Sequence, residues 1–142
     1  QLEDVPGIKA HRPPEESGST MGGWYAAKGL YVAEELGGLP VVRFCEAVNA
    51  EGGTFGLRPG ANPLMHLHSV LNEADIYGDG KPTRIAFSDR DLRQGVGSLP
   101  VSETLPERCL SIPWFKHYRP EVIDAYVAAI RKVVHCAEEL CT

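Results

Sequence analysis

The sequence has no long apolar run, and no stretch approaches the roughly 18 apolar residues that a membrane-spanning helix needs. The first twenty residues carry several charges and no apolar segment, so we expect no secretory signal peptide there. Basic residues form no run and do not alternate with aromatic ones, and 14 basic against 19 acidic side chains give a net charge of -5. We therefore expect no nucleic-acid and no membrane partner, whereas a small polar or anionic ligand is compatible with this composition.

Several signatures of known chemistry are also missing. The four cysteines, Cys45, Cys109, Cys136 and Cys141, contain no Cys-x-x-Cys pair, so we expect reduced, structural thiols in a cytoplasmic protein. No Gly-x-Ser-x-Gly segment supports a serine hydrolase. Residues 78–83 resemble a phosphate loop superficially but lack the Gly-x4-Gly-Lys-Ser/Thr spacing, which argues against a nucleotide site.

The 142 residues fit one domain, and 15 glycines with 11 prolines indicate many tight turns. An aromatic and β-branched segment over 24–33 predicts a strand, apolar on both faces, that is central and covered on both sides. Pro40 then opens a helix whose apolar residues recur at i, i+3, i+4 and i+7, until Gly52-Gly53 ends it. Residues 54–58 predict a short returning strand.

The second half of the chain predicts fewer regular elements. Residues 84–87 fit a short edge strand, 102–108 fit a helical turn that Pro106 cuts short, and 109–112 fit a strand. A helix begins at Pro120 and keeps a 3.6-residue apolar stripe to the C-terminus. With an extended piece near 8–11, the expected fold is α+β, a two-layer small domain with a mainly antiparallel sheet, two main helices on one face and a long loop. We expect a lead-in arm over 1–22 and a single small domain over 23–142.

The long loop over 59–84 holds the most interesting polar side chains, among them Asn62, His66 and His68. If the backbone is extended there, both imidazoles lie on one side and could bind a metal with Glu73 or Asp75, although no spaced cysteine or third histidine accompanies them. We expect the histidines to contact a ligand or to hydrogen-bond loop carbonyls rather than to bind a metal. Lys116 and His117 follow the strand at 109–112, where loops often gather ligands.

Several segments, taken together, resemble one known family. These are Gly-Gly-Trp-Tyr before the first strand, Leu-Pro-x-x-Arg-Phe-x-x-Ala-Val-x-Ala-Glu-Gly over 39–52, the Pro-Leu-x-x-His loop, Leu-Pro-Val-Ser-Glu over 99–103, and Leu-Ser-Ile-Pro-Trp-Phe over 110–115 before a terminal helix. Their order and spacing resemble the C-terminal small domain of the DegT/DnrJ/EryC1/StrS aminotransferases across nearly all of 22–134. Members of that family are dimeric pyridoxal-phosphate enzymes that move an amino group from glutamate or glutamine to a keto-sugar or cyclitol.

The resemblance implies that the loop faces the substrate side of a cleft, with Trp24, Asn62, His66, His68 and Lys116 as substrate-side candidates. The family's cofactor lysine, its pyridine-binding aspartate and its phosphate-binding groups belong to a large domain that precedes this stretch. We therefore expect no catalytic, cofactor-binding or metal-binding residue in this chain, and an isolated C-terminal domain that is truncated and inactive alone. Its partner would be a PLP-binding large domain.

The alternative is a free-standing module that kept the small-domain fold and binds a small molecule or self-associates as a homo-oligomer, such as a dimer. Its apolar contact surface would come from aromatic residues of the first strand and aliphatic residues of the long loop, namely Trp24, Tyr25, Tyr31, Leu64, Met65 and Leu67.

Overall fold

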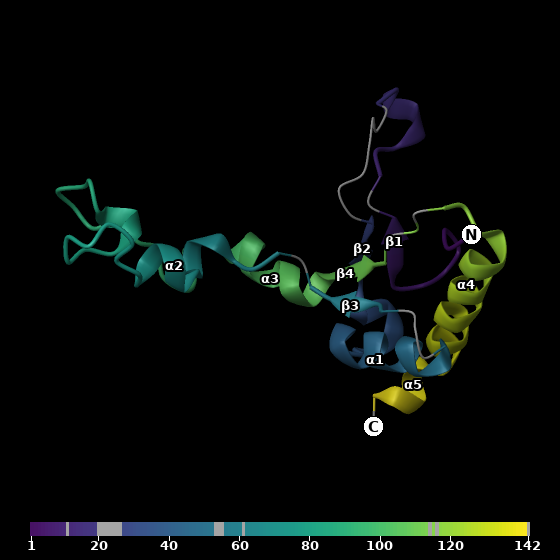
Figure 1. Ribbon diagram of the computed structural model, residues 1–142. Coiled ribbons are helices and arrows are strands. Elements are labelled where there is room, and N and C mark those ends of the chain that lie inside the picture. The colour runs from purple at the N-terminus through teal and green to yellow at the C-terminus, as the bar shows by residue number, and fades with distance from the viewer. Residues whose placement is uncertain are drawn as a thin grey trace. The chain divides into compact units, whose positions relative to one another are not determined.

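A computed structural model describes residues 1–10, 12–19, 27–52, 56–60, 62–113, 115 and 117–141. By its contacts the chain divides into two compact units (Figure 1), where we had expected one small domain preceded by an arm. Unit 1 comprises Gln1–Ala61 and Glu107–Thr142, and unit 2 comprises Asn62–Pro106. No helix within the described ranges combines the length and apolar character needed to cross a membrane.

Unit 1 is a small α+β unit built on a four-stranded antiparallel sheet, as the sequence predicts. The spatial order is β1-β2-β4-β3, and the strands are β1 (Ile8–Ala10), β2 (Ala27–Tyr31), β3 (Arg58–Pro59) and β4 (Cys109–Ile112). Strand β2 is central, pairing with β1 through Ile8 and Tyr31 and with β4 through Lys28 and Ser111. The predicted strands near 8–11 and over 109–112 are therefore confirmed where the structure describes them. The strand predicted over 24–33 is confirmed over Ala27–Tyr31 and ends earlier than expected, because a 3-10 helix begins at Ala33.

Two helices cover one face of this sheet. Helix α1 (Val41–Gly52) buries Val41, Phe44, Cys45 and Val48, the apolar positions that predicted it, and its first turn begins with Phe44 N donating to Pro40 O at 3.0 Å. Helix α4 (Pro120–His135) has proline at its start and buries Tyr126, Ala129, Ile130 and Val133, and the short helix α5 (Ala137–Leu140) follows it. These residues form one hydrophobic core with Ile8, Tyr31 and Leu110 of the sheet. The predicted helices are confirmed, apart from the break at Cys136.

The expected lead-in arm contributes residues to this core. Val5 and Ile8 are buried, and Gly7 N donates to Glu35 Oε2 at 2.7 Å. Gly7 has a φ of +74°, and a Cβ at this position would lie 2.5 Å from Leu36 Cδ1, so only glycine fits without movement. Two 3-10 helices, η1 (Glu15–Ser17) and η2 (Ala33–Leu36), each end at a left-handed glycine.

Unit 2 consists of short helical turns joined by irregular chain. Its elements are η3 (Met65–Leu67), α2 (Ser69–Asn72), η4 (Thr83–Ile85) and most of α3 (Pro100–Arg108). The predicted edge strand over 84–87 is wrong, because these residues form η4 and the turn after it. The single helical turn expected over 102–108 is also too short, since α3 begins at Pro100 and continues through Pro106 to Arg108. The strand expected over 54–58 is displaced to Arg58–Pro59, while residues 53–55 lie outside the described ranges.

Candidate functional site

The loop that carries the two histidines is held by local hydrogen bonds. Leu67 N donates to Leu64 O at 3.0 Å and His68 N donates to Met65 O at 3.2 Å, which closes the 3-10 turn η3. This backbone is helical over Met65–Leu67 and not extended, so the condition under which the two imidazoles would lie on one side is not met. His66 is buried, with 5% of its surface exposed, whereas His68 is half-buried.

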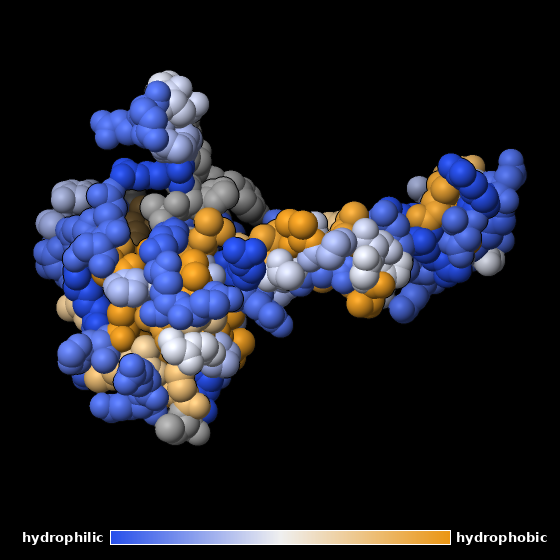
Figure 2. All heavy atoms as spheres, turned by 180° about the vertical axis from the view of Figure 1, so that it is seen from behind, coloured by the Kyte–Doolittle hydropathy of each residue, from blue (hydrophilic) through white to orange (hydrophobic). Residues whose placement is uncertain are grey.

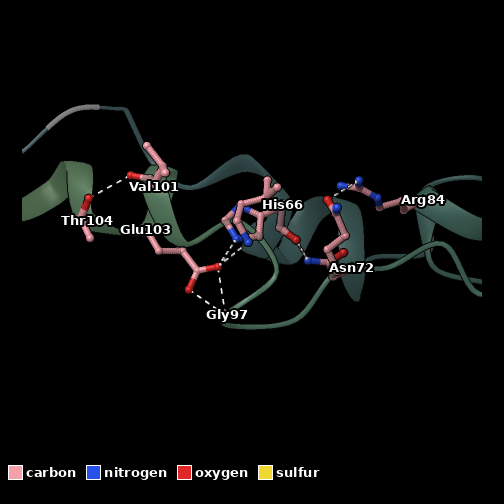
Figure 3. A network of polar contacts seen from close by, with 9 residues as sticks. His66, Asn72, Arg84, Gly97, Val101, Glu103 and Thr104 are labelled. Atoms are coloured by element: carbon pink, nitrogen blue, oxygen red, sulfur yellow. Dashed lines mark hydrogen bonds and ion pairs between the residues drawn. The ribbon is translucent and has the colours of Figure 1, made fainter.

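His66 is paired with Glu103 of helix α3 (Figure 3), and His66 Nε2 lies 3.0 Å from Glu103 Oε1. A carboxylate can only accept hydrogen bonds, so Nε2 carries the proton and donates it. The same carboxylate accepts from Gly97 N at 3.0 and 2.7 Å and from Leu99 N at 3.1 Å. These backbone N–H groups of Gly97 and Leu99, together with His66, hold the pKa of Glu103 below its ordinary 4.5.

Asn72 fixes the other side of the His66 turn. Its Nδ2 donates to the backbone oxygen of His66 at 2.6 Å, and its own backbone oxygen accepts from Arg93 Nη1 at 3.2 Å. Asn72 Oδ1 is buried, and no described residue donates to it. A buried acceptor without a donor is costly, so this oxygen is the position in unit 2 where a water or the N–H or O–H group of a polar ligand would be stabilised.

His68 has a different role from His66. It is the N-cap of α2, and its Nδ1 accepts a hydrogen bond from Val70 N at 3.2 Å. When the ring is neutral, an accepting Nδ1 leaves the proton on Nε2, which is then able to donate to an acceptor on a ligand. Of the two histidines, His68 is the less buried one.

This arrangement is better suited to holding a loop than to moving protons. His66 is buried and its Nε2 is already bonded to Glu103, so it has no open path to a substrate. No group of three His, Cys, Asp or Glu side chains that could hold a metal occurs among the residues that the structure describes. The carboxylate of Asp75 stabilises the loop backbone in the same way, because it accepts hydrogen bonds from the N–H groups of Gly78, Asp79 and Gly80 at 2.7, 3.2 and 2.8 Å.

The other candidates from the sequence do not join this cluster. Asn62 is exposed in a bend at the start of unit 2. Trp24 and Lys116 lie outside the described residues, and His117 is exposed.

Sequence reasoning did not identify Glu103 or Gly97 as part of the site. A local signal was present for Glu103, since a glutamate in the first turn of a helix commonly reaches back to free backbone N–H groups. Nothing local links it to His66, which lies 37 residues away.

Comparison with protein-family models, with curated proteins and with solved structures finds no match to this chain.

Proposed function

We propose that this chain is the C-terminal small domain of a PLP-dependent sugar or cyclitol aminotransferase-like protein of the DegT/DnrJ/EryC1/StrS type. In this role it contributes contacts on the substrate side and is inactive alone. The observation that carries the proposal is the order of elements in unit 1. Strand β2, helix α1, strand β4 and helix α4 follow one another along the segments that carry the resemblance, with both helices on one face of an antiparallel sheet.

The loop geometry supports a binding role for unit 2. The His66–Glu103 pair and Asn72 hold the turn that precedes His68, and the half-buried ring of His68 is itself bonded to Val70 N, so its position is fixed. A prearranged donor of this kind costs a ligand little ordering free energy. The expected ligand is a small polar molecule with several hydroxyl or carbonyl oxygens, in keeping with a sugar or cyclitol.

The chemistry of amino transfer would come from pyridoxal phosphate held by a preceding large domain. A lysine that forms a Schiff base is activated by desolvation in a pocket or by a neighbouring cation. Lys9, Lys81 and Lys132 are exposed, and the first and last of these are ion-paired with Glu35 and Glu51. These three lysines therefore do not fit the cofactor role, and Lys28 donates to Ser111 Oγ.

The test is to add stoichiometric pyridoxal phosphate to the purified chain, reduce with borohydride and map any modified lysine by peptide mass spectrometry. We expect no site-specific adduct and no amino transfer from glutamate or glutamine. A stoichiometric adduct on Lys28 or Lys116 would overturn the assignment of the cofactor to another domain.

A second function has an observation in its favour, namely a free-standing module that self-associates as a dimer or larger homo-oligomer. Within 62–106 only His66 and Ala86 are buried, and hydrophobic side chains reach the surface of this unit (Figure 2). Ten of the 14 exposed large hydrophobic residues among those described lie there, including Met65, Tyr77 and Phe87. Such surfaces commonly mark contacts with another protein surface.

The contact surface differs from the one that the sequence predicted. Tyr31 is 1% exposed and donates its hydroxyl to Leu39 O at 2.7 Å, so it is a core residue and not part of a contact. Leu64 and Leu67 are half-buried, and Trp24 and Tyr25 lie outside the described residues. Sedimentation of the chain at micromolar concentration tests this alternative. A dimer that Phe87→Ser weakens supports the module, and a monomer at all concentrations contradicts it.

For the compartment, we propose the cytoplasm. The support is that Cys45, Cys109, Cys136 and Cys141 are all free, with Cys141 exposed, as is usual where thiols are kept reduced. Mass spectrometry after alkylation of the protein in intact cells should find all four thiols unpaired.

A further inference from the structure

The sheet of unit 1 has a second face, opposite the helices, which carries several polar side chains, including Lys28 and Ser111. Successive residues of a strand point to opposite faces. Ile8, Tyr31 and Leu110 belong to the core, so their neighbours Lys9, Leu30 and Ser111 lie on the other face. Lys9 and Leu30 are exposed. We had expected this face to be covered, and its described residues show that it is open at these positions.

Three polar side chains are adjacent in one row across this open face. Ser111 of β4 pairs with Lys28 of β2 on one side and with Arg58 of β3 on the other. Lys28 Nζ donates to Ser111 Oγ at 2.6 Å, which confirms that these two side chains share a face. Arg58 follows the buried Leu57 and is itself exposed, so it points to the same side. With strands about 4.8 Å apart, the lysine and arginine backbones lie roughly 10 Å apart with the serine between them.

The two cations of this row have no carboxylate partner among the described residues, which is notable in a chain of net charge -5. Their neighbour on the same face, Lys9, is neutralised by Glu35 at 2.7 Å. Lys28 is half-buried and bonded only to a hydroxyl, so two of its three N–H groups have no described acceptor. The row therefore carries two positive charges that an anion would balance.

Ser111, which lies between the two cations, can also donate a hydrogen bond to an anion. Ser111 Oγ accepts from Lys28, and its only described acceptor is Gly60 O at 3.4 Å, the outer limit of a hydrogen bond. Its proton is therefore held weakly and can turn to a stronger acceptor. Ammonium, hydroxyl and guanidinium donors in one row match the several oxygens of a tetrahedral oxyanion, and the arginine fork suits phosphate in particular.

We propose that Lys28, Ser111 and Arg58 form a binding site for the phosphate group of a small phosphorylated molecule on the open face of the sheet. The three residues belong to unit 1, whereas the His66 loop belongs to unit 2. It does not depend on the proposed aminotransferase function.

The test is calorimetric titration of inorganic phosphate into the full chain at constant ionic strength, with acetate as a second titrant. Phosphate should bind saturably at one site, and acetate should bind at least about tenfold more weakly. Lys28→Gln and Arg58→Gln should each weaken phosphate binding about tenfold, the loss expected for one charge-assisted hydrogen bond. Arg43→Gln is the matched control, because Arg43 is an exposed arginine on helix α1 whose described partner is only Leu140 O.

A two-dimensional NMR titration with phosphate gives an independent readout on the unchanged chain. The amide signals of Lys28, Arg58 and Ser111 should move together with one dissociation constant. Equal binding of acetate, an equal loss in Arg43→Gln, or signal changes confined to other residues would overturn the proposal.

Discussion

Replacing His66 by phenylalanine tests whether the His66–Glu103 pair holds unit 2 together. The phenyl ring fills the buried space of the imidazole but cannot donate to Glu103 Oε1, now 3.0 Å from Nε2. Hydrogen bonds to charged groups contribute about 1.5–3 kcal/mol. The low end applies here, because the carboxylate keeps its bonds from Gly97 N and Leu99 N and is not left unpaired. We expect a loss of about 1.5 kcal/mol in the local unfolding free energy of 62–106.

Native-state hydrogen exchange measures this loss directly. The amides of Gly97, Leu99 and Asn72 should exchange about tenfold faster in His66→Phe, since 1.4 kcal/mol corresponds to a factor of ten. The core amides of α1 should not change, because they belong to the other compact unit. His68→Phe is the matched control, since it removes one 3.2 Å bond from a half-buried ring and should cost about 0.5 kcal/mol.

Three results would refute the reasoning behind this prediction. Exchange in 62–106 that is unchanged by His66→Phe would mean that the pair contributes nothing to the loop. Equal effects of the His66 and His68 variants would mean that neither ring has a specific role. A uniform rise in exchange across both units would show that the chain opens as one body.

A buried hydrogen bond, a close-packed glycine and a titrating carboxylate each give a further prediction. Tyr31→Phe removes the buried bond to Leu39 O and should lower the unfolding free energy by about 1–2 kcal/mol in urea denaturation, whereas Tyr118→Phe, at an 83% exposed site, should have no effect. Gly18→Ala should lower the unfolding free energy by about 1 kcal/mol, because alanine is strained in the left-handed backbone at this position. Gly7→Ala should lower it more, because there the new Cβ would also meet Leu36. Equal shifts of the melting temperature in the two variants would contradict this. The folded-state pKa of Glu103 lies below 4.5, so the stabilisation by its carboxylate is present above pH 4.5 and is lost as pH falls through the lower folded value. The carboxyl carbon of Glu103 should therefore titrate below pH 4.5 by NMR. Glu103→Gln should remove the acid-induced rise in hydrogen exchange at Leu99.

The sequence predicts the core of unit 1 well, for a specific reason. Val41, Phe44, Cys45 and Val48 repeat at the helical spacing, and each of them is buried, so a local pattern determines both the helix and its inner face. Strand β4 is equally local, because alternation over 109–112 and Pro113 define it. These elements need no knowledge of distant residues.

The loop is where local patterns fail. Ile85 and Phe87 fit a short strand as well as a turn, and Phe87 is 86% exposed, so no core decides between the two. The His66 turn depends on a carboxylate 37 residues away, which no spacing rule can supply. The helical backbone at η3 also removes the extended conformation on which the expected placement of His66 and His68 on one side depends. The paired row of Lys28, Ser111 and Arg58 requires the strand order, which sequence alone does not give.

We propose that this chain works as the small domain of a larger PLP-dependent protein. The most direct measurement is the intact mass of the natural protein that contains this sequence, isolated from its source after borohydride reduction. We expect a mass that exceeds 15.5 kDa by a whole further domain and includes one reduced pyridoxal phosphate bound to a lysine outside these 142 residues. A protein of 15.5 kDa without bound cofactor would contradict this proposal and favour the free-standing module.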